Sequence, residues 1–506
     1  MRTFLIALAA TSLPLIGSVA CSSSGSADEE EVVADEGALT VSDIAARGES
    51  QMRFPIAGRP DELCIIPKKP GGAYSPDDVK DEKKLCNFNF ESETPGEPVA
   101  LCPKTSSTNP GIYVNKLDGK TKAEVEAGGC RTSKVGTFKQ SVTCSYTGSI
   151  IGYYHLSRLL GGIASVPVAV GRTMDLEKHK AMVERGIVAA KPVDGPGFDV
   201  YDGWVQFKAW DARPQTAPRT AQVYTSDFMQ IYGAFQDNAK DNGRHPLLRT
   251  AGGAAGLNQF LGGSAFKAVS ESTPLAERFR GGAADAASLQ GLILAKDAAD
   301  MVLMDELLSQ QDRYGNIESQ AFKVFEEGGR LKKVRLDRAD EDQDRAETPI
   351  DRPDLPGVIV HELLLRDNDC GVSKTNINAQ ANGGAGVVSR LAHMSSRTYK
   401  HFQWLAAEIA KPNSDVQNVF AKESFFTPTD LTNVTQQARK LASTLKSRCE
   451  SGALALDADL RDHLAGRIPG REACGLAEPA PAPELGAEGG IIDAHGIERV
   501  ERKKPP

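Results

Sequence analysis

The chain has 506 residues, of which 40% are hydrophobic and 25% are charged, a composition typical of a soluble globular protein with a sizeable core. Its formal net charge is -8 at pH 7, and no part of the sequence forms a basic stripe. Because binding to phosphate backbones needs clustered lysine and arginine, these features argue against a nucleic-acid-binding protein.

The first 21 residues resemble a bacterial lipoprotein signal peptide. A positively charged start precedes an apolar segment, residues 4–16, and small residues then lead to Cys21. We expect Cys21 to carry the lipid of an exported chain; Ser18 stands where such signals usually have leucine, so simple secretion is the alternative. Residues 22–40 are small and acidic without periodicity, which predicts a flexible tether. No later segment reaches the roughly 18 apolar residues of a transmembrane helix.

Eight cysteines remain after Cys21, and an even number favours disulfides in an oxidising compartment. No two of them are spaced C-x-x-C, which argues against a zinc knuckle or a thioredoxin-type redox site. Five lie between residues 64 and 144 and predict an N-terminal region stapled by disulfides. The partners are open, and Cys370 with Cys449 or Cys474 is only a guess. The eight candidates are Cys64, Cys86, Cys102, Cys130, Cys144, Cys370, Cys449 and Cys474.

Residues 40–128 are rich in proline, glycine, lysine and aspartate, which predicts short strands and loops around the disulfides. The alternating segment 131–140 predicts a strand that carries Lys134 and Lys139.

The next two segments predict a helix followed by a strand. Residues 149–161 have apolar side chains at helical spacing and end at a glycine pair. Residues 163–172 are apolar but contain Pro167, which predicts a strand at the edge of a sheet or one entering a sheet. Residues 194–282 carry little readable pattern apart from a predicted strand at 203–209.

The second half begins with a strongly apolar segment, residues 283–308, which predicts a buried helix. A hairpin of two strands is predicted over residues 321–337, and residues 338–356 form a charged, proline-rich insertion. Residues 357–371 then predict a strand that ends at two aspartates. Helical patterns resume at 387–410 and 431–449, and residues 476–506 are predicted to be a disordered tail.

Acidic and amide side chains follow both the long helix and the last strand. Asp312 lies just after the helix with Asn316 four residues on, and Asp367 and Asp369 close the strand. Phosphoryl transfer from ATP needs a carboxylate that orients the attacking hydroxyl, oxygen ligands for a divalent cation and a lysine on the phosphates. In kinase-like folds these groups follow one another in this order, so the pattern favours a catalytic loop.

A resemblance supports this reading. Residues 153–172, YYHLSRLLGGIASVPVAVGR, are similar to the signature of the secretory-pathway kinases of the Golgi casein kinase, xylosylkinase and four-jointed type, which reads approximately F-H-L-D-R-x-L-x-F-x-x-V-P-P-x-V-G-R. In that family a D-R-H motif after an apolar helix carries the catalytic aspartate, matched here by Asp312, and a strand ending in L-D-N-G carries the metal aspartate, matched best by Asp367. The three blocks lie in the family's order between residues 131 and 371.

The resemblance implies an α+β, two-lobed protein-kinase-like fold. Residues 41–172 would form a disulfide-stapled N-terminal lobe, and residues 173–475 a mainly helical C-terminal lobe with insertions. The implied cofactors are ATP and Mg2+ or Mn2+. The implied activity transfers the γ-phosphate to a hydroxyl of a protein, a glycan or a small molecule. The location, the bacterial cell envelope with a lipid anchor in a membrane, is predicted by the lipoprotein-like signal and not by this resemblance.

The same resemblance implies roles for single residues. Asp312 is the expected catalytic residue, and Asn316 with Asp367 holds the metal; Asp369 is kept as a second candidate. The residues expected to hold the nucleotide are Lys139, its rival Lys134, and Arg172.

Each assignment has a structural alternative. Asp312 could be a solvated helix-end charge paired with Arg313, and Asp367 with Asp369 could form an Asx-type turn. The family has an acidic partner for its lysine five residues before the signature histidine, where this chain has Ile150. This difference keeps a second class open, a catalytically inactive kinase-like lipoprotein that acts as a binding or scaffold module. A structural lipoprotein of unrelated fold would instead place Asp312 and Asp367 far apart.

Overall fold

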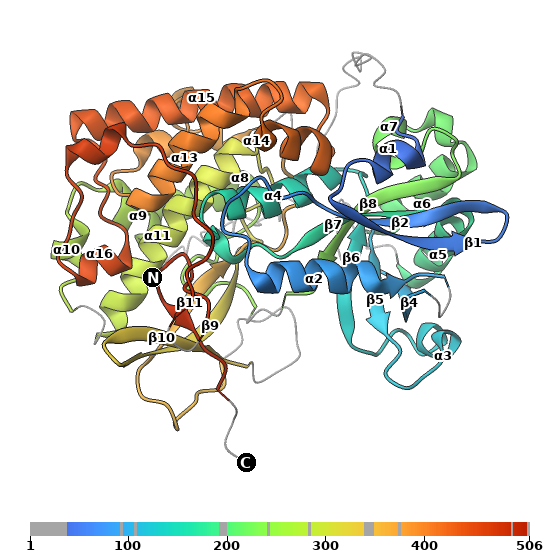
Figure 1. The fold of residues 1–506 in the computed structure, drawn as a ribbon, viewed down its shortest axis with the longest axis horizontal. Helices are drawn as coiled ribbons and strands as arrows, with labels where there is room; N and C mark the ends of the chain where they lie inside the picture. The colour runs from blue at the N-terminus through green and yellow to red at the C-terminus, as the bar shows by residue number, and fades with distance from the viewer. Residues whose placement is uncertain are drawn as a thin grey trace, which may run out of the picture.

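A large and a small β-sheet, each covered by helices, organise the chain in a computed structural model (Figure 1). The predicted signal peptide with Cys21 and nearly all of the predicted tether lie outside the described residues, as does most of the charged insertion. The structure describes residues 38–91, 95–105, 109–191, 200–239, 243–281, 285–337, 349–372, 376–486 and 489–502.

The large sheet has the strand order β1-β2-β7-β8-β6-β5-β4-β3. Strand β8 lies between β7 and β6 and is antiparallel to both, so the sheet draws on residues well beyond 172. The predicted boundary of the N-terminal part at residue 172 is therefore corrected, because β8 completes the centre of the sheet. The strands are β1 Ser50–Ile56, β2 Arg59–Ile66, β3 Phe88–Asn89, β4 Glu97–Pro103, β5 Ile112–Lys116, β6 Lys134–Lys139, β7 Ala169–Asp175 and β8 Gln230–Asp237.

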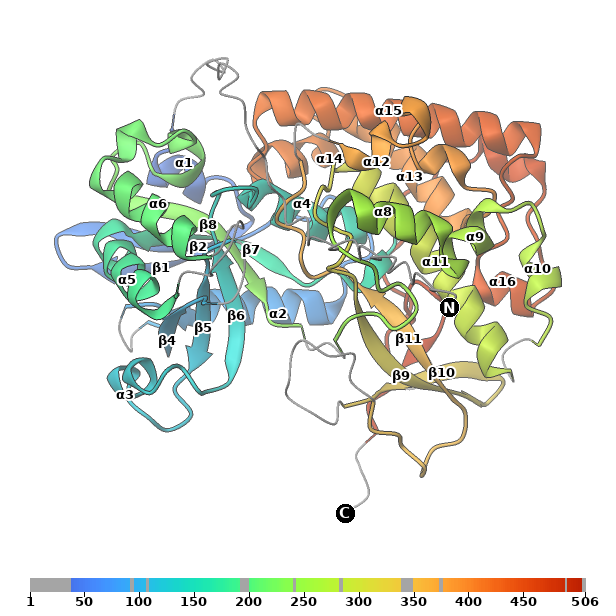
Figure 2. The same ribbon diagram turned by 180° about the vertical axis from the view of Figure 1, so that it is seen from behind.

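Helices from the first half of the chain cover this sheet (Figure 2). Helix α2 is joined to α4 by the buried ion pair of Asp78 with Arg158, at 2.7 Å, and α5 packs against α6. The predicted strand at 203–209 is wrong, because this segment belongs to α6. There Trp204, Phe207 and Trp210 recur at the spacing of a buried helix face. The helices are α1 Val41–Ala45, α2 Pro76–Asn87, α3 Lys122–Ala127, α4 Thr147–Leu159, α5 Leu176–Ala189, α6 Val200–Ala212 and α7 Thr220–Val223.

The small sheet has the strand order β11-β9-β10-β12. The predicted hairpin is confirmed as β9 Glu318–Glu327 and β10 Arg330–Arg335, and the predicted strand before the two aspartates as β11 Val358–Leu364. Helix α11, Ala286–Leu307, packs on β11 and is buried along most of its length. The predicted apolar helix is thereby confirmed as the core of this part of the molecule.

The remaining helices gather around α11, with α13 and α15 side by side (Figure 1). The predicted helical segments are confirmed here, although α13 begins nine residues later than expected, at Ser396. Among the described residues no helix combines the length and apolarity needed to cross a membrane. These helices are α8 Gly253–Gly262, α9 Ser264–Ser270, α10 Leu275–Arg278, α12 Ile377–Gln380, α13 Ser396–Ile409, α14 Asp415–Asn418, α15 Pro428–Ser451 and α16 Leu460–Leu464.

The C-terminal segment is packed against the small sheet. Strand β12, Glu498–Arg499, runs parallel to β10, Ile497 is fully buried, and His495 contacts Asp297 of α11 at 3.1 Å. The prediction of a disordered tail from residue 476 is therefore corrected for the described part of the segment. Composition did not reveal this packing, because the buried residues are few and widely spaced.

All eight candidate cysteines are paired, as predicted. The guess that joined Cys370 to the C-terminal cysteines is wrong: Cys370 pairs with Cys144, and the Cα atoms of the two are 4.9 Å apart. A disulfide forms where the fold brings two Cα atoms within about 7 Å, and sequence spacing does not reveal that. The other pairs are Cys64–Cys86, Cys102–Cys130 and Cys449–Cys474.

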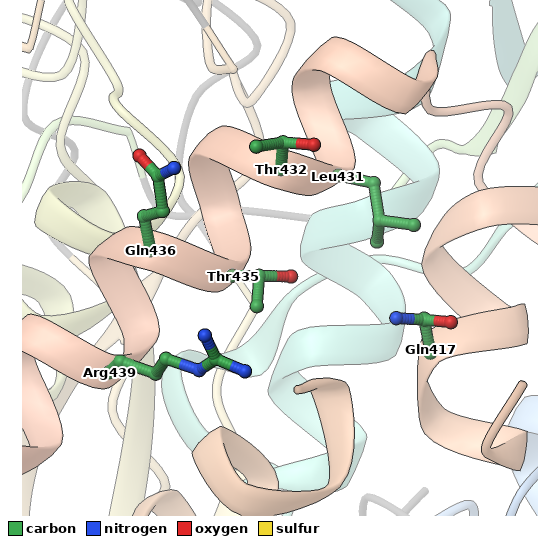
Figure 3. Close-up of a pocket in the computed structure, with 6 residues that line it drawn as sticks. All are labelled: Gln417, Leu431, Thr432, Thr435, Gln436 and Arg439. Atoms are coloured by element: carbon green, nitrogen blue, oxygen red, sulfur yellow. The ribbon is translucent and has the colours of Figure 1, made fainter. Parts of the chain in front are cut away.

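An open hollow of about 220 Å³ lies between α14 and α15 (Figure 3). Its polar atoms are amides, hydroxyls and one guanidinium, with no carboxylate. None of the residues predicted to act on a nucleotide lines it. The lining residues are Gln417, Leu431, Thr432, Thr435, Gln436 and Arg439.

Candidate active site

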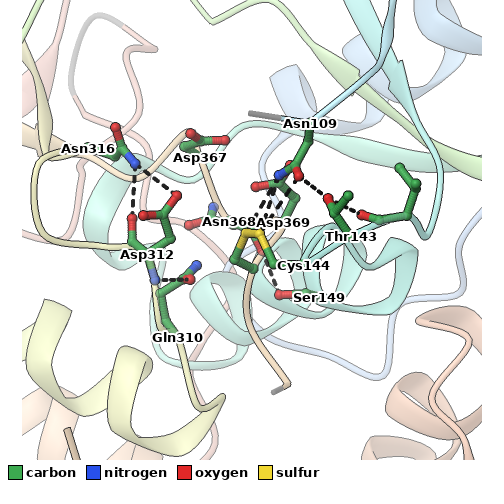
Figure 4. Close-up of a disulfide and its surroundings, with 12 residues drawn as sticks. Asn109, Thr143, Cys144, Ser149, Gln310, Asp312, Asn316, Asp367, Asn368 and Asp369 are labelled. Atoms are coloured by element: carbon green, nitrogen blue, oxygen red, sulfur yellow. Dashed lines mark hydrogen bonds between the residues drawn. A yellow bond between two sulfur atoms is a disulfide. The ribbon is translucent and has the colours of Figure 1, made fainter. Parts of the chain in front are cut away.

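Three segments remote in sequence meet near the end of β6. They are the C-terminal residue of that strand, the loop at residues 308–316 after α11, and the loop at residues 365–372 after β11. The first loop turns sharply, with a left-handed backbone at Ser309 and Gly315. Figure 4 shows Asp312 and Asn316 facing the second loop, with Asp367 beside them. This proximity contradicts the alternative in which Asp312 and Asp367 lie far apart.

Lys139 is the centre of the charged cluster. Its ammonium donates to Asp367 Oδ1 and to Asp369 Oδ2, each at 3.0 Å. The side chains of Lys139 and Asp369 are nearly buried, whereas that of Asp367 is 38% exposed. The sequence alone did not reveal a carboxylate partner for this lysine, and the structure supplies two. Because Asp367 is the more accessible, a ligand would reach it first.

The charges of this cluster stabilise one another in their ionised forms. Burial on its own would lower the pKa of Lys139, but the carboxylates of Asp367 and Asp369 outweigh it, so this pKa lies above its ordinary value. The Lys139 charge in turn holds the pKa of Asp367 well below its usual range, against the effect of burial, and Lys104 adds to this lowering. Lys139 is therefore a cation and Asp367 an anion at neutral pH.

Asp312 has the opposite electrostatics. Burial, with further contributions from Asp367 and Asp369, raises the pKa of its carboxyl to about 7, although Arg313 and Lys139 oppose the rise. Its backbone NH donates to Gln310 Oε1 at 3.0 Å, and Asn316 Nδ2 donates to both its carbonyl oxygen and its carboxylate. A carboxylate poised near neutral pH can accept a proton from a hydroxyl, as a general base does.

This pKa predicts a pH-dependent effect of the neutral substitution Asp312→Asn. Because the pKa of Asp312 is raised in the folded chain, its contribution to stability is fully present below the unfolded value of about 3.9 and is lost as pH rises through about 7. The variant is expected to melt above the wild type at pH 8, and the difference should shrink at pH 5. Thermal melts at the two pH values measure it, and a difference independent of pH would contradict the prediction.

Arg313 ties the two loops to α11. Its buried guanidinium donates twice to Asp305, at 2.9 and 3.0 Å, and also to the carbonyl oxygen of Asp367 and to Asn368 Oδ1. Tyr153 of α4 donates to the same Asp305 at 2.7 Å. The structural alternative to a catalytic role paired Asp312 with Arg313, but the structure shows Asp305 as the partner of Arg313. Asp312 therefore keeps its carboxylate available at the cluster.

The second loop is fixed from the other side by the chain that follows β6. The Cys144–Cys370 disulfide joins the two segments, Ser149 donates to the carbonyl oxygen of Asn368 at 2.5 Å, and the Tyr146 NH donates to that of Asp369 at 2.8 Å. Figure 4 shows the disulfide next to Asp369. These contacts hold the aspartates on a short, rigid connection to the strand that carries Lys139.

The structure does not bring two of the predicted nucleotide residues to this cluster. Arg172 pairs with Gly233 of β8, whereas Lys139 pairs with the next residue, Ala234, so the two side chains lie on opposite faces of the sheet. Arg172 is sandwiched between two phenylalanine rings and bonds the buried Glu62. The expectation that it holds a nucleotide is corrected to a role in the core.

Lys134 lies at the opposite end of β6 from Lys139, with its ammonium 4.6 Å from the centroid of the Tyr113 ring. Five steps along the strand separate the two lysines by roughly 16 Å. Of the two rivals, Lys139 is therefore the one that reaches the aspartates. Ile150, the position at which the resemblance predicts an acidic partner for the lysine, is buried in the core. The carboxylates that bond Lys139 are those of Asp367 and Asp369.

The donor set fits a hard divalent cation in its chemistry, because carboxylate and amide oxygens are the ligands that Mg2+ and Mn2+ prefer. Asp367, Asp369 and Asn316 are the residues that would hold it. Among the described residues, however, no three acidic, histidine or cysteine side chains stand together as a ready-made metal group. The ammonium of Lys139 bonds both aspartates instead, so cation binding has to displace or share this contact.

The comparisons with known proteins leave the family open. No protein-family model matches the chain, and no curated protein matches it. Among solved structures, it is similar to one described as the crystal structure of the Golgi casein kinase with Mn/ADP bound. The identity is 11%, the match covers 81% of this chain and 82% of that one, and the TM-score is 0.39.

Proposed function

We propose that the protein is an exported, kinase-like phosphotransferase that moves the γ-phosphate of ATP to a hydroxyl of a protein, a glycan or a small molecule, with Mg2+ or Mn2+. The observation that carries this proposal is the meeting of Lys139, Asp312 and the Asp367–Asp369 pair from three separate segments. A cation for the phosphates, a base for the hydroxyl and oxygen ligands for a metal are the parts that phosphoryl transfer needs.

The roles follow from the electrostatics of each group. Lys139 binds the phosphate chain, because it stays charged at neutral pH. Asp312 orients the acceptor hydroxyl and takes its proton, since its pKa lies near 7. Asp367, Asp369 and Asn316 hold the divalent cation, which when bound neutralises charge on the phosphate oxygens. In this arrangement the large sheet and its helices act as one lobe of a two-lobed protein-kinase-like fold, and the small sheet with α8 to α16 acts as the other.

The ion pair between Lys139 and the aspartates predicts that nucleotide and divalent cation bind cooperatively. If Lys139 separates from Asp367 and Asp369, buried charges of both signs lose their partners, and an unpaired buried charge is costly. A phosphate chain gives Lys139 a new partner, and a divalent cation gives one to the aspartates. We therefore expect nucleotide and metal to bind much more tightly in combination than either does alone.

The proposed location is the bacterial cell envelope. Cys21 would carry a lipid that anchors the chain to a membrane, on its periplasmic or surface face, and the acidic residues after it would serve as the tether. The four disulfides support this location, because structural disulfides persist in oxidising compartments.

A second candidate function is a catalytically inactive, kinase-like binding or scaffold module. The observation that favours it is the same ion pair: Lys139 already bonds both aspartates, and Ile150 offers no acidic partner to draw the lysine away. In this reading the cluster stabilises the fold and a partner is bound elsewhere.

Ligand-induced stabilisation tests the proposal. The mature chain, kept in detergent, is melted alone, with ATP, with Mn2+, and with both. A ligand pair at about 100 times its dissociation constant adds about 2.7 kcal/mol to the free energy of unfolding, so the melting temperature should rise clearly only when both are present. An unchanged melting temperature at millimolar ATP and Mn2+ would contradict nucleotide binding and favour the scaffold. A shift without release of ADP over hours in the presence of acceptors would retain binding but contradict catalysis.

A further inference from the structure

A second lysine, which the sequence analysis did not identify, lies beside the charged cluster. Lys104 follows strand β4, and its NH donates to the carbonyl oxygen of Gly111, the residue before β5, at 2.9 Å. Pro103 pairs with Ile112, and Ile112 pairs with Phe138. The same register one residue further places Gly111 between Lys104 and Lys139. Because residues paired across strands point to the same face, Lys104 and Lys139 share one face of the sheet.

The residue between the two lysines is a glycine. A Cβ at Gly111 would lie 3.6 Å from Cγ of Lys139, so a longer side chain here would stand between the two lysines. With two strand spacings between them, the backbones of Lys104 and Lys139 lie roughly 10 Å apart. Two long, flexible lysine side chains can converge over that distance on one multiply charged group.

Lys104 faces the same charges as Lys139 but does not bond them. Within the described part of the chain, no side chain or carbonyl oxygen forms an ion pair or hydrogen bond with its ammonium. Burial and the charge of Lys139 lower the pKa of this half-buried Lys104 side chain to about 8. The carboxylates of Asp367 and Asp369 oppose this lowering. Trp204 anchors its backbone, with the indole NH donating to the Lys104 carbonyl oxygen at 3.0 Å.

We propose that Lys104 is a second phosphate-binding residue, which together with Lys139 clamps the phosphate chain of a nucleoside triphosphate across Gly111. The inference rests on the proposed phosphotransferase function and adds to it a ligand residue on a different strand. A desolvated ammonium without a bonded partner gains a charge-assisted hydrogen bond when a phosphate oxygen arrives, which is the kind of contact that binds phosphates most strongly. Lys104 would hold the end of the phosphate chain that lies farther from Asp369.

Substitution at Lys104 tests the clamp by isothermal titration of ATP in the presence of Mn2+. Lys104→Met removes the charge and keeps the apolar stem, and we expect the dissociation constant for ATP to rise about 10-fold to 100-fold, since hydrogen bonds to charged groups contribute about 1.5–3 kcal/mol. Lys104→Arg should bind within a few-fold of the wild type. Lys116→Met, on a half-buried lysine at the other end of β5 that pairs with Glu97, is the matched control and should not change the affinity.

A charge-specific readout separates binding from a structural role. The affinity for ATP should fall with ionic strength less steeply in Lys104→Met than in the wild type, because one cation is missing, while Lys104→Arg keeps the full dependence. Equal ATP affinity and equal salt dependence in Lys104→Met and the wild type would overturn the clamp and leave the proposed function standing. Absence of ATP binding in the wild type would overturn the proposed function itself.

Discussion

Replacement of Asp312 by asparagine is expected to lower kcat by about 10²-fold to 10⁴-fold, the usual contribution of a general base. The amide has nearly the same shape, so contacts with Gln310 and Asn316 are kept, but it cannot take a proton from the acceptor hydroxyl. The rise in melting temperature with ATP and Mn2+ should survive, because Asp312 is not among the residues proposed to hold either ligand. ADP release under saturating ATP measures the first effect and thermal melting the second.

Asp462→Asn is a suitable control for this variant, since Asp462 lies on a surface helix and its carboxylate accepts a hydrogen bond from Arg467, at 3.4 Å. It should leave both quantities unchanged. Turnover by Asp312→Asn at the wild-type rate would remove Asp312 from the chemistry and would favour the reading of the first loop as a solvated helix end.

Breaking the buried pair of Arg313 and Asp305 is expected to have the largest effect on stability. Arg313→Met leaves the carboxylate of Asp305 buried without its cation, and removal of one partner of a buried pair costs about 3–5 kcal/mol. Both loops lose their common anchor, because Arg313 also bonds Asp367 and Asn368. Chemical denaturation of the variant should show this loss, together with weakened binding of Mn2+ and ATP.

A double-substitution cycle separates the charge from the packing. Asp305→Asn/Arg313→Met removes both charges and keeps an acceptor for the Tyr153 hydroxyl, so it is expected to be more stable than Arg313→Met alone. If the double variant were less stable than either single variant, the contribution of Arg313 would come from its contacts with the second loop and not from its pairing with Asp305.

Local sequence patterns determined the order of most elements. The apolar run that became α11, the hairpin β9–β10 and the strand β11 were all predicted, because burial imposes a period on the side chains that is visible without the fold. The even number of cysteines also predicted disulfides correctly. The pattern failed at α6, where residues 203–209 predict a strand, since a short aromatic segment suits either element.

The sequence also determined which residues could act, but the tertiary structure decided which of them meet. It indicated Asp312, Asp367, Asp369 and Lys139 as candidates, and the fold places these together while it sends Arg172 to the other face of the sheet. Lys104, the pairing of Cys144 with Cys370 and the anchoring of Arg313 by Asp305 depend on contacts between segments far apart in the chain. Such contacts leave no local period, because they follow from strand register and loop position.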